Sequence, residues 1–76
     1  MKYKYIERNP NVLGGKPVFK GTRIPIYLIL DFLSAGETIN EILENYPQLS
    51  REAILEAIRY ASEYTKLEED LIETSN

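Results

Sequence analysis

Two residue types that the chain lacks limit its chemistry, because its 76 residues include neither cysteine nor histidine. That composition excludes disulfides, the usual zinc sites and histidine general-base catalysis. Ser34, Ser50 and Ser62 have no base to activate them. The carboxylates of Glu52 and Glu56 could hold a magnesium ion, but no second group completes such a site. We therefore predict no enzymatic activity, no cofactor and no metal.

Gly14, Gly15 and Lys16 match only part of a phosphate-binding loop. The full motif is GxxxxGK followed by serine or threonine and then by a helix. Here Pro17 follows the lysine, so the motif is incomplete. The two glycines instead favour a tight reversal of the chain with positive φ.

A basic loop precedes the first predicted helix and carries Lys16, Lys20 and Arg23. Such a loop can hold a DNA backbone through charge, which gives affinity without sequence information. Arg23 has a second, structural interpretation as the partner of a carboxylate such as Asp31 or one on the third helix. We favour that structural role for Arg23, and we expect the two lysines to face solvent or phosphate.

The start of the third predicted helix carries residues that could contact base edges in a major groove. Arg51 can donate two parallel hydrogen bonds to guanine. The nearby Glu52 would repel phosphate, so this helix is more acidic than an ordinary recognition helix. The predicted DNA contacts are Lys16, Lys20, Arg23, Gln48, Ser50, Arg51 and Arg59.

Charge is divided unequally along the chain, although the net charge is only -3. Residues 1–30 contain six basic residues and one acidic residue, a balance of +5. Residues 31–76 contain three basic and eleven acidic residues, a balance of -8. Such asymmetry favours one anionic and one cationic partner. The alternative is that the glutamates merely keep the helices solvated.

The elements that must position these residues are two short strands and three helices. Alternation over residues 2–7 and the run 16–20 predict strands that pair as a hairpin or form an arm. Helical patterns span 25–35, 39–45 and 51–65, and the last could continue to residue 73. Gly36 should end the first helix, Thr38 with Glu41 forms a capping box, and Ser50 should cap the third. The first helix has almost no polar face, so we expect it to be the most buried element.

The third helix carries two apolar stripes at helical spacing. We expect Ile54, Ile58, Ala61 and Thr65 to face the domain core. A second stripe, rotated by roughly 100°, is predicted to dock a second copy of the chain or another protein. The alternative is that the N-terminal hairpin folds over it. This second stripe consists of Tyr60, Tyr64, Leu67 and Leu71.

The chain is long enough for one domain, and a core this small is often stabilised by a second copy. We predict a single domain over 1–76, with an N-terminal hairpin or arm (1–24), a three-helix core (25–65) and an acidic helical or disordered tail (66–76). The fold class is mainly α, a trihelical helix-turn-helix with a short N-terminal hairpin, and a homodimer is expected. The polar start MKYKYIERNP and the short apolar run 24–33 predict a soluble, cytoplasmic protein without a membrane span.

Two segments of the sequence resemble a known family. The run NPNVLGGKPVFKGTRIP at residues 9–25, and GETINEIL at 36–43 followed by Tyr46 and Pro47, are similar to the bacterial domain-of-unknown-function family 433. The resemblance covers roughly residues 5–62. It implies a homeodomain-like helix-turn-helix fold and the role of an antitoxin paired with a PIN-like ribonuclease toxin.

The implied toxin gives the acidic residues a second interpretation. A ribonuclease that holds RNA carries a basic rim, and an acidic helix there would compete electrostatically. The predicted partner contacts are Glu52, Glu56, Glu63, Glu68, Glu69 and Asp70. The expected function is an antitoxin or small regulator that binds its own promoter and such a toxin; the alternative is an interaction adaptor that binds no DNA.

Overall fold

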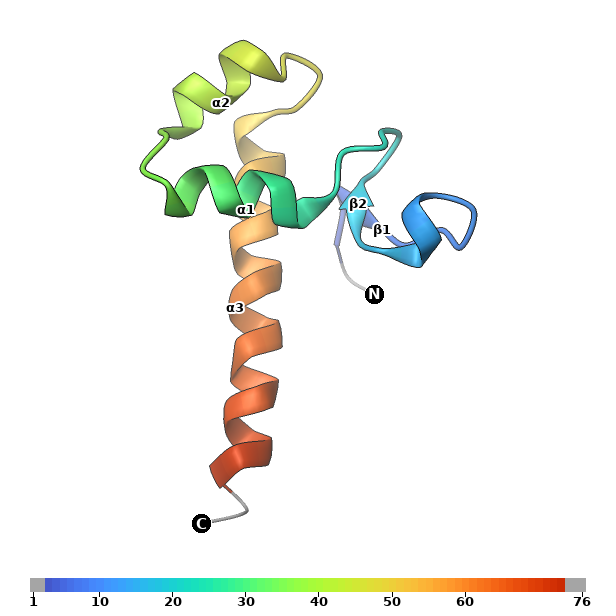
Figure 1. Cartoon of the computed structure of the whole chain (residues 1–76), viewed down its shortest axis with the longest axis vertical. Coiled ribbons are helices and arrows are strands. Elements are labelled where there is room, and N and C mark those ends of the chain that lie inside the picture. The colour runs from blue at the N-terminus through green and yellow to red at the C-terminus, as the bar shows by residue number, and fades with distance from the viewer. Residues whose placement is uncertain (1–2, 74–76) are drawn as a thin grey trace.

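The computed structural model describes the backbone of residues 3–73 and the side chains of residues 3–66. Within that range the chain forms β1 (Ile6–Glu7), a 3₁₀ turn η1 (Leu13–Gly15), β2 (Val18–Phe19), α1 (Ile26–Ser34), α2 (Ile39–Asn45) and α3 (Arg51–Glu73). α1 crosses α3, α2 lies near the start of α3, and the lower half of α3 extends away from the other elements (Figure 1). The predicted mainly α fold with a short N-terminal hairpin is confirmed.

The N-terminal hairpin is shorter than the sequence predicts. β1 pairs antiparallel with β2, with Ile6 opposite Phe19 and Glu7 opposite Val18. Residues 3–5 leave the expected strand because the backbone N–H groups of Lys4 and Tyr5 donate to a side chain on α3. Pro17 has no N–H for a ladder and shortens the second strand.

α1 is less buried than its composition predicts. It begins after Pro25, which is the N-cap, and ends before Gly36, whose φ of 98° and N–H donation to the Leu33 carbonyl confirm the predicted stop. Within α1 only Ile26 and Ile29 are fully buried, and Tyr27 is exposed. The expectation that α1 is the most buried element was therefore wrong, because part of its apolar face looks into the angle between α1 and α3.

α2 has the predicted bounds and the predicted capping box. The Glu41 N–H donates to Thr38 Oγ1 at 3.1 Å, and the Thr38 N–H donates to Glu41 Oε1 at 2.9 Å. The hydrogen bond from the Thr38 backbone lowers the pKa of the Glu41 carboxyl. This box fixes the start of α2 and, through it, the turn that leads into α3.

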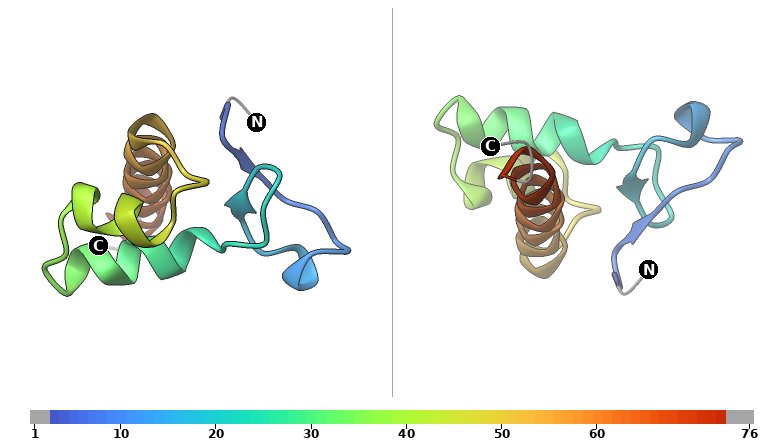
Figure 2. Two further views of the ribbon diagram at one scale, coloured as in Figure 1. Left: turned by 90° about the horizontal axis from the view of Figure 1, so that it is seen from above. Right: turned by 90° about the horizontal axis from the view of Figure 1, so that it is seen from below.

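The core lies where α1, α2, α3 and the hairpin meet. Its largest fully buried side chains are Val18, Phe19, Ile29, Ile42 and Ile54. Figure 2 looks along α3 and shows α1 and α2 on one part of its circumference and the N-terminal segment on another. Within the described residues, no helix is long and apolar enough to cross a membrane.

α3 turns a different face to the core than the sequence predicts. Its buried apolar residues are Ala53, Ile54, Ala57 and Tyr60. Ile58 is 40% exposed and Thr65 is also exposed, so the predicted stripe through Ile58, Ala61 and Thr65 was wrong. The buried face is rotated by about 80° because the N-terminal segment packs beside Tyr60.

Candidate nucleic-acid interface

Caps and a hydrogen bond fix the start of α3. The Ala53 N–H donates to Ser50 Oγ at 3.1 Å, which confirms Ser50 as the predicted cap. Arg51 Nη2 donates to Asn40 Oδ1 at 3.0 Å, which ties the first turn of α3 to α2. Leu49 is buried in the connecting turn. The turn 46–50 thus joins α2 to α3, and among the described side chains those on the outer side of α3, including Arg51, Leu55 and Arg59, are exposed.

The outer side of α3 carries every basic residue of the second half of the sequence. Arg51, Arg59 and Lys66 are all exposed. At 100° per residue these three positions lie within about 80° of one another around α3, opposite the buried face that includes Ile54 and Ala57. The strongly acidic second half therefore presents its positive charge on one face, which we call the basic face of α3 (Arg51, Arg59 and Lys66).

Arg59 is the most constrained member of this face. Its Nη1 lies 3.0 Å from Glu63 Oε1 and its Nη2 lies 3.3 Å from Glu56 Oε1. Its guanidinium carbon also lies 4.8 Å from the centroid of the Tyr3 ring. Half of the side chain remains exposed, so Arg59 could reach phosphate once it releases Glu63.

Glu56 faces the N-terminal segment and not a partner. It is only 9% exposed. Its carboxylate accepts the Lys4 N–H at 2.8 Å and the Tyr5 N–H at 2.5 Å. The prediction that Glu56 belongs to an exposed partner-binding surface was wrong, because the backbone N–H groups of residues 4 and 5 occupy its oxygens.

Tyr60 is likewise used within the chain. It is 8% exposed, its ring meets Tyr3 edge to face at 5.2 Å, and Arg8 Nη2 donates to its hydroxyl at 3.0 Å. The alternative of an N-terminal segment folded over this stripe holds at Tyr60. Tyr60 still lines an apolar groove, so its role as a dimer contact stays a prediction. Tyr64, one turn further, is 51% exposed.

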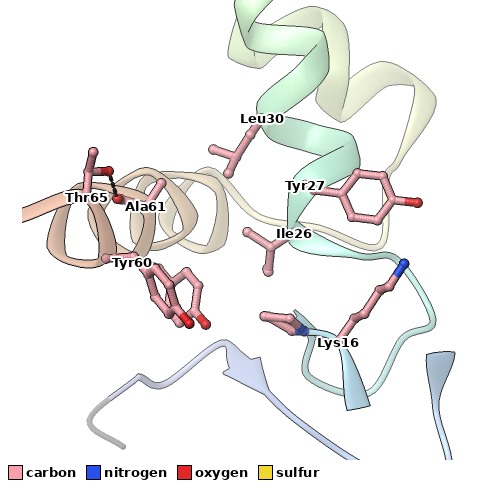
Figure 3. Close-up of a pocket in the computed structure, with 9 residues that line it drawn as sticks. Lys16, Ile26, Tyr27, Leu30, Tyr60, Ala61 and Thr65 are labelled. Carbon is pink, nitrogen blue, oxygen red and sulfur yellow. Dashed lines mark hydrogen bonds between the residues drawn. The ribbon is translucent and has the colours of Figure 1, made fainter. Parts of the chain in front are cut away.

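An apolar groove of about 320 Å³ lies in the angle between α1 and α3, on a different side of α3 from the basic face. Ile26 and Leu30 point from α1 toward α3, and Tyr60 and Ala61 line the opposite wall (Figure 3). Lys16 lies at its edge, with Nζ 5.6 Å from the centroid of the Tyr27 ring. Sequence analysis missed this groove because its walls come from separate segments.

The predicted DNA contacts fall into two groups. Gln48, Ser50 and Arg51 lie together at the start of α3, and Arg59 lies two turns along. The loop that carries Lys20 and Arg23 lies on the same side of α3 as the turn 46–50 in both Figure 1 and Figure 2. Lys16 lines the groove beside residues 60–65 and is separate from Arg51.

Arg23 does not have the predicted structural partner. Arg23 and Asp31 are both exposed, and over residues 3–66 Arg23 forms an ion pair with neither Asp31 nor another carboxylate. The expected ion pair was wrong for this part of the chain, since Arg23 follows the turn of Gly21 and faces solvent.

Several predicted site residues lie beyond the described side chains: Glu68, Glu69, Asp70, Leu67 and Leu71. Of the other predicted partner contacts, Glu52 and Glu63 are exposed. Among the described residues, no cluster of three carboxylates could hold a metal ion. Lys66 is a basic-face residue that sequence analysis missed, although its spacing of seven residues from Arg59 could have placed it on that face.

Comparisons with known proteins agree with the resemblance seen in the sequence. The family model described as "Protein of unknown function (DUF433)" matches residues 6–61. An uncharacterized protein of Sinorhizobium fredii is 39% identical over 56 residues, which are 74% of this chain and 25% of that protein. The chain thus spans about a quarter of the length of this curated relative.

A solved structure shares the fold. The crystal structure of a DUF433 member from Anabaena variabilis has a TM-score of 0.76 and 29% sequence identity. The match covers 91% of this chain and 68% of that one. The similarity therefore extends over the hairpin and all three helices.

Proposed function

Because the chain belongs to DUF433, a family whose description names no activity, we propose a function from its own surface: it is a small regulator that binds double-stranded DNA through α3. The observation that carries this proposal is the exposed basic face of α3 (Arg51, Arg59 and Lys66). We interpret α2, the turn 46–50 and α3 as a helix-turn-helix, of which α3 is the second helix. In that arrangement the second helix is the one that enters the major groove.

The dimensions of the basic face suit a major groove. Fifteen residues separate Arg51 from Lys66, which corresponds to about 22 Å along the helix axis. That length is shorter than one DNA turn of about 34 Å, so a single groove segment could meet the whole face. Leu55 is exposed between the arginines and could contact a thymine methyl group.

The position and chemistry of each basic residue predict whether it contacts bases or phosphates. Arg51, at the start of α3, is placed where recognition helices contact base edges, and its guanidinium can donate two hydrogen bonds to guanine. Lys66 would meet phosphate. Lys20 and Arg23, exposed in the loop beside the turn 46–50, would hold the backbone and add affinity without sequence preference.

Two carboxylates oppose this function. Glu52 and Glu63 are exposed at one edge of the basic face, and each would approach phosphate. Glu63 also competes with DNA for Arg59. We expect modest affinity in the natural chain and tighter binding when Glu63 is made neutral, because Arg59 is then released.

The toxin-binding half of the expected function has weaker support. Glu56 is buried, so the acidic residues predicted to meet a PIN-like ribonuclease do not form one exposed surface. Neutralisation of such a toxin stays a prediction, which co-purification with a PIN-like protein encoded beside this chain would check. The alternative function is an adaptor that binds protein and no DNA. The DNA-binding experiments below distinguish it from the regulator.

Fluorescence anisotropy on the chain's own upstream duplex and on a shuffled duplex tests DNA binding. Arg51→Ala should weaken binding to the specific duplex by about 1–3 kcal/mol, and Arg51→Lys should restore the charge without the specificity. Lys20→Ala should weaken binding to both duplexes equally and reduce the salt slope by about one unit.

Opposite results would favour the adaptor. If neither duplex binds, or if Arg51→Ala and Lys20→Ala change nothing, the regulator proposal fails. Charge reversal at Glu52 would then be expected to loosen a protein complex instead.

A further inference from the structure

The C-terminal half of α3 continues beyond the domain. Tyr60 is the last buried residue described on α3, and residues 62–66 are all exposed. The helix nevertheless runs to Glu73 without a break (Figure 1). A helical segment of this length is marginal in water by itself and usually depends on packing for its stability. We therefore expect the helix beyond Ala61 to be stabilised by packing against another segment.

The apolar groove lies where that segment leaves the domain. Its walls include Pro17, Leu30, Ala61 and Tyr64. Tyr27 and Tyr64, at its margins, are each more than half exposed. An exposed concave surface of this composition is typical of a site for another chain, and it is continuous with the free side of α3.

The margin of the groove is positively charged. Lys16 lies over the Tyr27 ring on one side. Arg8 donates to the hydroxyl of Tyr60, which is itself one of the groove-lining residues. The groove thus combines an apolar floor with two cations, which suits an occupant that is both apolar and acidic.

The chain contains one segment with that composition. Residues 67–73, LEEDLIE, include four acidic residues and no basic residue, together with two leucines four positions apart. Because α3 is an unbroken helix from Arg51 to Glu73, this segment cannot turn back into the groove of its own chain. The same segment of a second copy has no such restriction.

We propose that two copies of the chain pair through antiparallel α3 helices, with residues 67–73 of each lying in the apolar groove of the other. Residues 61–65, beside the groove, and residues 67–73 lie at similar distances on either side of residue 66. A two-fold axis near residue 66 would therefore seat both segments at once, as a closed symmetric dimer requires.

Charge favours the antiparallel arrangement over a parallel one. Parallel helices would set the two LEEDLIE segments side by side, and like charges in contact are destabilising. The antiparallel pair separates them and brings each close to Lys16 and Arg8 of the other copy. Self-association also accounts for the opposite charges of the two halves of the sequence. The proposal does not depend on DNA binding.

Sedimentation equilibrium of the full-length chain over a wide range of concentration tests the proposal. The natural chain should form dimers. Lys16→Glu should raise the dimer dissociation constant about tenfold, and Glu68→Lys combined with Asp70→Lys should do the same. The matched control is Glu44→Lys combined with Glu52→Lys, which makes the same change in net charge at exposed sites away from the groove and should leave dimerisation nearly unchanged.

A mixture of the two variants gives the sharpest result. Lys16→Glu chains combined with chains carrying Glu68→Lys and Asp70→Lys should form heterodimers, because both grooves then meet a segment of opposite charge. A natural chain that stays monomeric at every concentration overturns the proposal. A dimer that is insensitive to both variants also overturns it, since the interface must then lie elsewhere.

An uncharged comparison guards against unfolding of the variants. Tyr64→Ala removes a groove residue and Leu55→Ala removes one from the outer side of α3, and the two natural side chains are 51% and 49% exposed. Only Tyr64→Ala should weaken the dimer, and circular dichroism should show both variants folded. Equal weakening by both, or weakening by Leu55→Ala alone, would contradict the proposed interface.

Discussion

The two halves of α3 have the same helical geometry and opposite relations to the rest of the chain. From Arg51 to Tyr60 the helix is held by the core, by the turn 46–50 and by the N-terminal segment. From Ala61 onward it leaves the domain, and the described side chains at 62–66 are exposed. The first half therefore contributes to the core of the domain, whereas the described side chains of the second half are exposed to solvent.

The difference shows that an apolar stripe on a helix does not by itself say what covers it. Tyr60 and Tyr64 are four residues apart and their rings are neighbours, with centroids 5.8 Å apart. Tyr60 is 8% exposed beside Tyr3 and Arg8, whereas Tyr64 is 51% exposed. Where the N-terminal segment lies therefore decides the boundary between core and surface.

The largest expected effect comes from the core side of the first half. Ile54→Ala should lower the free energy of unfolding by about 2–5 kcal/mol, because the natural side chain is completely buried. Ile58→Ala removes the same atoms one turn further along, where the side chain is partly exposed, and should cost about 1 kcal/mol or less. Urea denaturation measures both. Equal losses would contradict the rotated core face described for α3.

A smaller effect should follow from the two carboxylates that flank Arg59. Glu56→Gln should destabilise the chain by about 1–3 kcal/mol, because one of the two backbone N–H groups would then lose its acceptor. Glu63→Gln breaks an exposed ion pair and should cost about 1 kcal/mol at most. The same denaturation series compares them, and anisotropy should show tighter DNA binding by the Glu63 variant. If Glu63→Gln lowered the free energy of unfolding more than Glu56→Gln does, the assignment of Glu56 as the structural carboxylate and Glu63 as the surface carboxylate would be wrong.

The smallest effect should be a pH dependence of stability that arises at the start of α2, the helix that packs against α3. The capping box lowers the pKa of Glu41 in the folded chain, so its contribution to stability is present above the ordinary glutamate pKa. That contribution should be lost as the pH falls through the lowered pKa. The urea midpoint of the natural chain should exceed that of Glu41→Gln near neutral pH, and the two should converge in acid. Glu41→Gln should leave dimerisation near neutral pH unchanged, because Glu41 does not line the groove.

Local signals predicted the helices well. Thr38 with Glu41, Ser50 and Gly36 each act within a few residues of themselves, and the capping box, the α3 cap and the α1 stop occur where the sequence places them. The order of the three helices follows from these signals alone. The free energy of a cap or of a helix stop depends on residues that are adjacent in sequence, so these features can be recognised from the sequence alone.

The side chains of α3 were less predictable because their surroundings are set by distant residues. Ile54 and Ile58 have equal hydrophobicity, yet the first is fully buried and the second is 40% exposed, because the segments that form the core with α3 cover only one side of it. The burial of Glu56 depends on two backbone N–H groups more than fifty residues away. Helical periodicity contains no information about such partners. The groove was missed for the same reason, since Pro17, Leu30 and Tyr64 are far apart in sequence.

The attachment of residues 4 and 5 to Glu56 has a consequence for the order in which the chain folds. These hydrogen bonds join positions 52 and 51 residues apart, and Arg8 meets Tyr60 across 52 residues. During synthesis the N-terminal segment cannot make these contacts until α3 has been made as far as Tyr60. Contacts between such remote positions also slow folding, because the loop between them must close first. Residues 4–8 are therefore among the last parts of the domain to be fixed, although they are made before any of its helices.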